Sequence, residues 1–402
     1  MKNIIQEMRK SDNMKFKRIF LMILDSIGVG EALDANNYDD NGANTLGHIK
    51  ENYDLFVPNL KKLGFLNTVN MDENKDVDAY YTIARPTNPG KDTLNGHYEI
   101  MGVKNDIQFK TFTEKGFPRE LLDNIEYLTG RKVIGNKNSS GIEIINELGE
   151  RHMQYGYLIV YTSNGSNLQI AAHENIIPVS KLYEYAENIR QITLREEWKI
   201  GRVIARPFTG TKPGNFKFTN ERQDYAVKPP TMSVMNFLKE NNYSVISIGK
   251  VADVFDHEGI TKTIKAKNNS EALSKLNDIM TKNFTGLCAV NLNDFDSEYG
   301  HKRDLEGYAK KIEELDVEIP IVLNKLETDD LLIITADHGC DPTFKGFDHT
   351  RENVPVIIYG RNLKEPKKLD ILDSMADIGA TIADNFEVNK PFIGKSFLDE
   401  LK

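Results

Sequence analysis

The sequence predicts an α/β fold with a mainly parallel sheet, and two observations carry this prediction. First, several short runs are apolar on both faces instead of alternating, as the strands of a buried parallel sheet are. These runs are IFLMIL (19–24), SVISIG (244–249), LCAVNL (287–292), LLIITA (331–336) and VPVIIYG (354–360). Second, charged segments with a helical period separate the runs, for example residues 271–283 and 306–327.

The middle of the chain predicts a second domain. The 402 residues are enough for two domains, or for one large domain with an insertion. Residues 108–226 contain their own strand-like and helix-like runs, followed by a cluster of proline and glycine in RPFTGTKPGNF (206–216). We therefore expect residues 1–107 and 227–402 to form a core and residues 108–226 to form an inserted α/β domain.

Composition argues against several classes of function. The formal net charge is −9 and no long basic stretch offsets it, so nucleic acid is not an expected partner. No apolar run approaches the roughly 18 residues that a membrane span needs. The two cysteines, Cys288 and Cys340, are too few for a disulfide framework. We expect a cytoplasmic protein without a membrane partner.

Three of the predicted strands carry metal-binding side chains at their carboxyl ends, where open α/β sheets bind ligands. These residues are Asp25 after the first run, Asp296 and His301 after LCAVNL, and Asp337, His338 and His349 after LLIITA. A mixed set of Asp and His suits Mn²⁺, Zn²⁺ or Fe²⁺ better than Mg²⁺ or Ca²⁺. Six such ligands exceed one tetrahedral zinc and fit two metals about 3.5–4 Å apart. Singly, aspartates after strands are also common caps and turn residues.

The stretch TNPGKDTLNGHYEIMG (87–102) contains a candidate nucleophile, Thr93. A Walker loop is excluded because Asp92 follows the lysine where that motif needs Ser or Thr. GVGEAL (28–33) lacks the third glycine of a dinucleotide fingerprint. Thr93 lies in a glycine-flanked loop before a predicted helix, and a metal would make its hydroxyl competent. The alternative is a threonine that only caps the helix.

Five stretches together resemble phosphopentomutase of the bacterial type, in the alkaline phosphatase superfamily. They are DSIGVGEALDA (25–35), GKDTLNGHYEIMG (90–102), GRKVIGNKNSSGIEIINELG (130–149), GRVIARPF (201–208) and ADHGCDPTFKGFDHTRE (336–352). Their order and spacing are nearly colinear with that family from about residue 16 onward. The resemblance implies an alkaline-phosphatase-like catalytic core with residues 108–226 as its cap domain.

The resemblance also implies the site. Two Mn²⁺ ions would be bound, with Zn²⁺ and Mg²⁺ as alternatives. One ion would be held by Asp25, Asp337 and His338 with the Thr93 oxygen, and the other by Asp296, His301 and His349. Thr93 would be the residue that is phosphorylated. The side chains implied at the substrate are Ser163, Arg202, Arg206 and Lys250.

The implied activity is that of an intramolecular phosphotransferase of the isomerase class. It would interconvert α-ribose 1-phosphate and ribose 5-phosphate, or the 2-deoxy pair, in nucleotide and pentose phosphate metabolism. Phosphorylated Thr93 would give its phosphoryl group to the free hydroxyl of the sugar phosphate. A 1,5-bisphosphate would form, turn around and return its other phosphate to Thr93. A sugar bisphosphate would act as the activator.

The chain departs from this family in the cap strand, which reads YTSNGSN (161–167). Gly165 stands where the family has aspartate, and Asn167 stands where it has a small apolar residue. A mutase for a different sugar phosphate therefore stays open. Cys340 follows ADHG where asparagine is common. A metal-dependent phosphatase or phosphodiesterase and a non-catalytic sugar-phosphate-binding protein also stay open. Cofactor-independent phosphoglycerate mutase shares the core, but its cap and motifs fit less well.

Overall fold

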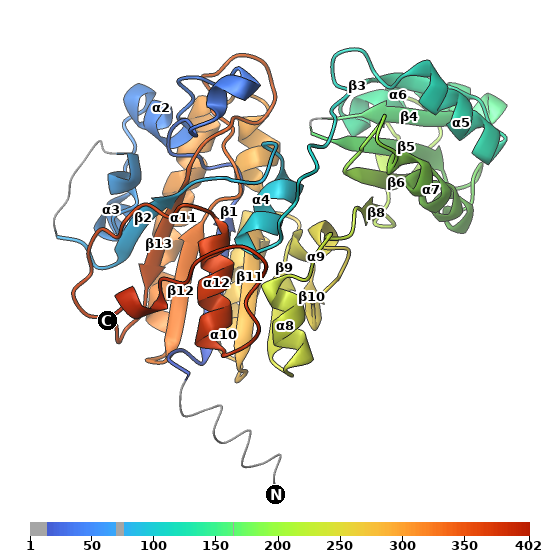
Figure 1. Cartoon of the computed structure of the whole chain (residues 1–402). Coiled ribbons are helices and arrows are strands. Elements are labelled where there is room, and N and C mark those ends of the chain that lie inside the picture. Colours follow the sequence, from blue (N-terminus) through green and yellow to red (C-terminus); the bar gives the residue numbers. More distant parts are fainter. Residues whose placement is uncertain (1–13, 70–75, 164) are drawn as a thin grey trace, which may run out of the picture. The chain divides into compact units, whose positions relative to one another are not determined.

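The chain folds into two compact units (Figure 1). The structure is a computed structural model that describes residues 14–69, 76–163 and 165–402. The core unit comprises Met1–Asp106 and Lys228–Lys402, and the inserted unit comprises Ile107–Val227. Each of these bounds lies within one residue of the bound expected from the sequence. Each unit has a sheet of its own.

A seven-stranded sheet forms the centre of the core unit. Its order is β10 (Lys262–Ile264), β9 (Ser244–Ile248), β11 (Gly286–Leu292), β1 (Arg18–Leu24), β12 (Asp330–Thr335), β13 (Val354–Tyr359) and β2 (Tyr80–Ala84). Pairing is parallel from β10 to β12, whereas β13 is antiparallel to both of its neighbours. The expectation that residues 354–360 form a parallel strand is therefore wrong. A strand buried on both faces has the same composition in either direction, so the apolar run could not reveal its direction.

Helices cover both faces of this sheet. One layer consists of α4 (Thr93–Ile100), α8 (Val234–Glu240), α9 (Val251–Val254) and α12 (Ala376–Asn385), and α12 crosses in front of the strands in Figure 1. The other layer consists of α2 (Thr45–Asn52), α3 (Pro58–Lys62), α10 (Asn269–Met280) and α11 (Leu305–Lys325). The short helices are η1 (Ala35–Tyr38), η2 (Leu66–Val69), the π-helix η3 (Phe295–Gly300) and η4 (Leu398–Glu400). Cover on both faces explains why the strands are apolar throughout.

The central strands are joined by a buried ion pair at their amino ends. Arg18 on β1 is in register with Asp330 on β12. Arg18 Nε donates to Asp330 Oδ1 at 2.7 Å and Nη2 donates to Oδ2 at 2.6 Å. The two side chains are almost fully buried, so this bidentate contact is shielded from water.

The inserted unit contains a six-stranded sheet. Its order is β3 (Val133–Asn138), β4 (Leu158–Thr162), β5 (Asn167–His173), β6 (Arg202–Thr209) and β7 (Lys217–Phe218), with β8 (Gln223–Ala226) paired to β6. Helices α5 (Arg119–Thr129) and α7 (Val179–Thr193) pack with Trp198 into one apolar core. Helix α6 (Gly141–Tyr155) packs with Phe208 into a second core. This unit is thus α/β in its own right.

Two further expectations concern the chain as a whole. Among the helices of the described residues, none is long and apolar enough to cross a membrane. Cys288 and Cys340 are both free and buried.

Candidate metal centre

Asp25, Asp337 and His338 meet at the carboxyl edge of the core sheet. Ile23 on β1 is in register with Thr335 on β12, so the two aspartates each lie two residues further along adjacent strands. Nε2 of His338 lies 3.6 Å from Asp25 Oδ1 and 3.4 Å from Asp337 Oδ2. One ligand atom from each residue lies within 4.8 Å of the others. We call these three residues the first cluster.

Asp296, His301 and His349 form the second cluster. Asp296 lies in η3 and His301 directly follows it, and π-helical turns frequently occur at functional sites. Nε2 of His301 lies 3.4 Å from Asp296 Oδ2, and Nε2 of His349 lies 3.2 Å from Asp296 Oδ1. The two Nε2 atoms are 2.9 Å apart. The clusters adjoin, because the ring centroids of His349 and His338 are 3.9 Å apart.

A loop that folds back on β12 brings His349 beside His338. Gly339 N donates to Thr350 O at 3.2 Å, and Thr350 N donates to Gly339 O at 2.9 Å. In this antiparallel bridge His338 and His349 lie diagonally across from each other on the same face, and their ring centroids are 3.9 Å apart. This explains why so many Asp and His residues follow β12. Asp337 and His338 at the end of the strand and His349 at the end of the loop contribute to one site.

Hydrogen bonds at Nδ1 orient two of the imidazoles. Nδ1 of His301 lies 2.8 Å from the Phe347 carbonyl oxygen, and Nδ1 of His338 lies 3.1 Å from the Gly339 carbonyl oxygen. A carbonyl oxygen only accepts, so Nδ1 carries a proton in both rings, and Nε2 is the nitrogen left to bind a metal ion. Metal-binding histidines are usually fixed in this way.

Three buried carboxylate oxygens in the clusters accept no well-formed hydrogen bond from a described residue, and each has a histidine ring nitrogen 3.1–3.6 Å away. They are Asp25 Oδ1, Asp296 Oδ1 and Asp337 Oδ2. A buried anionic oxygen is costly unless a cation or donor compensates it. Asp oxygens and His nitrogens are also the ligands that Mn²⁺, Zn²⁺ and Fe²⁺ share. Both clusters therefore fit a divalent metal ion.

The carboxyl groups have pKa values shifted in opposite directions. Burial raises the pKa of Asp25, and the adjacent charge of Asp337 raises it further. Burial acts on Asp337 and Asp296 as well, but the neighbouring histidines outweigh it and hold the pKa of each below its usual range. Like charges this close resist ionising together, and a divalent cation would relieve that repulsion.

Thr93 is the first residue of α4, and its hydroxyl is not used to cap the helix. Asp92 is the N-cap residue, and its Oδ1 accepts from Asn95 N at 3.1 Å. The capping role that the sequence left open for Thr93 thus belongs to its neighbour. Thr93 Oγ1 lies 3.3 Å from His338 Nε2, so the hydroxyl lies at the first cluster.

Lys250 follows β9, and its side chain also lies at the first cluster. Its Nζ lies 3.2 Å from Thr93 Oγ1 and also pairs with the Asp25 carboxylate. Asn291 Nδ2 donates to the same Asp25 oxygen at 2.8 Å. The structure thus places Lys250, which the resemblance assigns to substrate, directly at the candidate nucleophile.

Helix α4 lies against the end of β12 because residue 96 is glycine. A Cβ at Gly96 would lie 2.0 Å from the backbone oxygen of Asp337. The next residue, His97, places Nδ1 3.0 Å from Thr93 O and 3.1 Å from Asp337 Oδ2. The sequence assigned His97 no role. Its spacing of four residues from Thr93, on a helix that is buried throughout, is the signal that could have found it.

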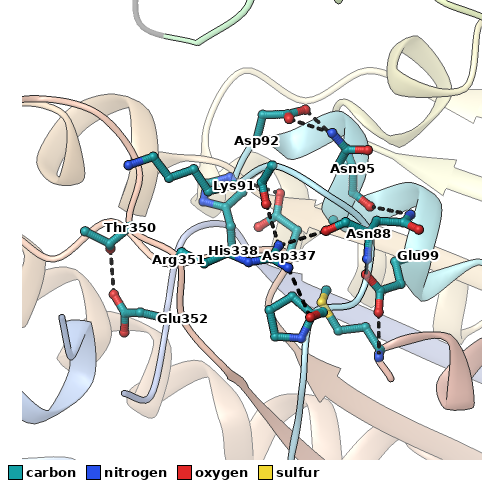
Figure 2. A pocket seen from close by; sticks show the side chains of 14 residues that line it. Asn88, Lys91, Asp92, Asn95, Glu99, Asp337, His338, Thr350, Arg351 and Glu352 are labelled. Atoms are coloured by element: carbon teal, nitrogen blue, oxygen red, sulfur yellow. Dashed lines mark hydrogen bonds and ion pairs between the residues drawn. The ribbon is translucent and has the colours of Figure 1, made fainter. Parts of the chain in front are cut away.

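A small pocket adjoins the first cluster (Figure 2). Asp337 and His338 line it, and its volume of about 10 Å³ suits about one water molecule. Arg351, labelled in Figure 2, donates through Nη1 to Asn88 O at 2.9 Å and also to Gly90 O. This buried guanidinium therefore fixes the loop that precedes α4.

The other substrate residues expected from the sequence lie in the inserted unit. Arg202 Nη1 is 3.7 Å from the buried carboxylate of Asp224. Arg206 Nη1 donates to Gln169 Oε1 at 3.0 Å, and Gln169 Nε2 donates to Ser163 Oγ. Ser163 and Arg206 thus share one amide side chain, whereas Arg202 contacts a separate carboxylate.

The turn that departs from the resembled family is stabilised by Asn167. Its Oδ1 accepts from Ser163 N at 3.1 Å and from Ser163 Oγ at 3.2 Å. Gly165 has φ +83°, in the left-handed region that favours glycine. The amide of Asn167 therefore serves the turn itself.

An α/β core with two adjoining Asp and His clusters at the carboxyl edge of its sheet defines a candidate metal-dependent enzyme. The family model described as "Metalloenzyme superfamily" matches residues 17–390, and the chain belongs to this superfamily. The predicted fold class, an alkaline-phosphatase-like α/β core with a mainly parallel sheet, is confirmed.

The solved structures that match this chain have low sequence identity to it. A protein of Pyrococcus horikoshii is 15% identical with a TM-score of 0.48, covering 94% of this chain and 100% of that chain. Phosphoglycerate mutase of Leishmania mexicana, at low cobalt concentration, is 13% identical with a TM-score of 0.48, covering 95% and 97%. Cofactor-independent phosphoglycerate mutase of Thermoplasma acidophilum is 11% identical with a TM-score of 0.39, covering 92% and 99%.

Proposed function

We propose that the protein is a metal-dependent phosphomutase that interconverts pentose 1-phosphates and pentose 5-phosphates through phosphorylated Thr93. The position of the Thr93 hydroxyl carries this proposal. Its oxygen lies 3.3 Å from His338 Nε2 and 3.2 Å from Lys250 Nζ, beside two clusters of metal-binding side chains. A role in stabilising the helix alone would not account for these contacts of the Thr93 hydroxyl.

Each half of the reaction would exchange one phosphorus–oxygen bond. The bond from phosphorus to Thr93 Oγ1 breaks as the oxygen of a sugar hydroxyl bonds to phosphorus, and the hydroxyl proton ends on Thr93. Lys250 donates to Thr93 Oγ1, so its positive charge stabilises the oxygen as it leaves. The bisphosphate can then turn around and return its other phosphoryl group to Thr93.

The two clusters would hold two Mn²⁺ ions, with Zn²⁺ or Mg²⁺ as alternatives. Such ions neutralise the charge on the transferring phosphoryl oxygens, which is most of what this chemistry requires. Arg202 and Arg206 of the inserted unit would bind the substrate phosphate, since a guanidinium pairs with phosphate through two parallel hydrogen bonds. Ser163 would contact the sugar.

A different sugar phosphate is the second candidate substrate. Gly165 supplies no carboxylate to accept from a sugar hydroxyl, and the Asn167 carbonyl already accepts from Ser163. A buried hydroxyl that loses its acceptor costs about 1–3 kcal/mol. A pentose with another arrangement of hydroxyls would escape that cost.

Intact-mass measurement tests the phosphorylated threonine. After exposure to a pentose bisphosphate, the wild type is expected to gain one phosphoryl group and Thr93→Val none. Thr281→Val is the matched control, because Thr281 is an exposed residue at the end of α10 and this variant should gain the group. An unmodified wild type, or a phosphorylated Thr93→Val, contradicts the proposal.

Phosphorus NMR tests the reaction class and the sugar. Ribose 5-phosphate with the metal-loaded enzyme should give ribose 1-phosphate. Release of inorganic phosphate instead identifies a phosphatase. The same assay with 2-deoxyribose and arabinose phosphates compares the sugars, and a clear preference for ribose excludes the second candidate.

A further inference from the structure

The sulfur of Cys340 lies at the second cluster. Cys340 is two residues beyond His338, and its side chain is fully buried. Its Sγ, one oxygen of Asp296 and one ring nitrogen of His301 all lie within 4.8 Å of one another. Asp296 is 7% exposed, and its Oδ1 accepts no hydrogen bond from a described residue. His349 Nε2 lies 3.2 Å from this oxygen. The sulfur thus adjoins a buried group of candidate metal ligands.

The guanidinium group of Arg303 lies beside this sulfur. Arg303 Nη1 donates to Sγ at 3.2 Å. Sγ can also donate to Asp348 O at 3.8 Å, and this oxygen accepts from Arg303 Nη2 at 2.7 Å. A guanidinium and the candidate ligands Asp296 and His301 are therefore all close neighbours of the sulfur. A cation that binds at this cluster would displace the thiol proton to solvent, as it does at other cysteine ligands.

The sulfur is also held in place. A Cβ at Gly300 would lie 3.0 Å from Cys340 Sγ, so the side chain packs closely on η3, which carries Asp296. Arg303 fixes the loop on the other side, because its Nε donates to Gly346 O at 2.7 Å. The distance between sulfur and Asp296 is therefore set by packing on both sides.

We infer that Cys340 supplies a sulfur ligand to the cation held by Asp296 and His301, so that the second cluster selects a softer metal than the first. The inference rests on the metal-dependent function proposed above and names the metal preference of that site. Thiolate is a soft ligand that favours Zn²⁺ and Co²⁺, whereas the first cluster offers two carboxylates and one imidazole. The two positions would then bind different ions from a mixture of Zn²⁺ and Mn²⁺.

Cobalt(II) spectroscopy tests the sulfur ligand without reference to activity. The full chain is loaded with Co²⁺, freed of excess metal, and examined for a near-ultraviolet band of sulfur-to-cobalt charge transfer. The wild type should show the band and Cys340→Ala should lack it. Cys288→Ala is the matched control, because Cys288 is the chain's other cysteine, is buried in β11 and belongs to neither cluster. A cobalt-loaded wild type without the band, or a Cys288→Ala protein that loses it, overturns the inference.

A second measurement needs no variant. X-ray absorption of the zinc-loaded wild type should show sulfur at about 2.3 Å from zinc, with about one sulfur for every two zinc ions when both clusters are filled. Scattering from nitrogen and oxygen alone overturns the inference. After equilibration with Zn²⁺ and Mn²⁺, the ratio of bound zinc to bound manganese should fall about 10-fold or more in Cys340→Ala. An unchanged ratio also contradicts it.

The outcomes separate this inference from the proposed function. A protein that transfers phosphoryl groups through Thr93 but lacks every sulfur signal refutes the role of Cys340 alone. A protein with the sulfur signal but without phosphorylation of Thr93 refutes the proposed function alone. A chain that binds no divalent cation refutes both.

Discussion

Lys250 contacts both the Asp25 carboxylate and the Thr93 hydroxyl, with Nζ 3.2 Å from Thr93 Oγ1. Asp25 belongs to the first cluster, so a lysine cation and a metal cation would share one carboxylate. Lys250 lies two residues after β9, which adds a further strand end to the strands that build the clusters. The ammonium group thus joins the candidate nucleophile to the metal ligands.

Replacing Lys250 by methionine should slow phosphoryl transfer while metal binding remains. Methionine keeps most of the volume and removes the positive donor to Thr93 Oγ1. Loss of one preorganised donor typically lowers kcat about 10²–10³-fold. Steady-state rates and metal content measure the two effects, with Lys267→Met as an exposed control. A Lys250→Met enzyme at full rate would show that the contact has no catalytic role.

Gly96→Ala should separate α4 from the first cluster. The new Cβ would lie 2.0 Å from Asp337 O, and a backbone atom cannot yield as a flexible side chain can. Overpacking of this kind costs about 1–3 kcal/mol, and misplacing a reacting group by about 1 Å can cost 10²-fold in rate. Urea unfolding and the mutase rate measure both effects. Unchanged stability together with an unchanged rate would contradict the close approach.

Acid should destabilise the inserted unit through His152. Its Nε2 accepts from His173 N at 2.9 Å, and burial lowers the pKa of His152 to about 4. An unfolded histidine titrates near pH 6.5, so the unfolded chain binds more protons between pH 6.5 and 4. The stabilising contribution is complete above pH 6.5 and is lost as the pH falls through this window, by about 3 kcal/mol in all.

Urea unfolding of the full chain at several pH values measures this loss. His152→Gln should lose part of the pH dependence, because glutamine does not titrate. His257→Gln, at an exposed histidine, should keep the dependence of the wild type. Equal pH profiles for the wild type and His152→Gln would contradict the prediction.

Asp330→Ala should destabilise the core unit strongly. It leaves Arg18 buried without its bidentate partner, and breaking one side of a buried pair costs about 3–5 kcal/mol. Glu327 provides a control on the same guanidinium, since its carboxylate lies 3.5 Å from Arg18 Nη2 but is 63% exposed. Glu327→Ala should cost less than about 1 kcal/mol. Urea unfolding measures the free energy of unfolding of both variants. Similar losses in Asp330→Ala and Glu327→Ala would contradict the prediction.

Much of the core sheet could be predicted because its strands are buried on both faces. The run at 19–24 differs from β1 by one residue at its start, and the run at 331–336 differs from β12 by one residue at each end. The direction of β13 could not be predicted, because its neighbours in the sheet and not its own side chains decide how it pairs. Strand order is non-local in the same way, and it is what places β11 and β12 on either side of β1.

The candidate site was predicted to a similar depth. Strand ends pointed to Asp25, Asp296 and Asp337, because carboxyl ends of parallel strands share one edge. His97 was missed, because its contact with Asp337 depends on how closely α4 approaches β12. That approach is decided by a missing side chain at Gly96, which no pattern of polar and apolar residues records.

Because of the loop closed by Gly339 and Thr350, the first and second clusters are held by backbone of different rigidity. The residues of the first cluster lie at the ends of neighbouring strands, whereas His349 of the second cluster lies in a loop that two backbone hydrogen bonds close. Strands hold side chains more rigidly than loops do. An ion bound by the first cluster should therefore exchange more slowly than an ion bound by the second cluster, and metal should enter and leave the site mainly at the second cluster.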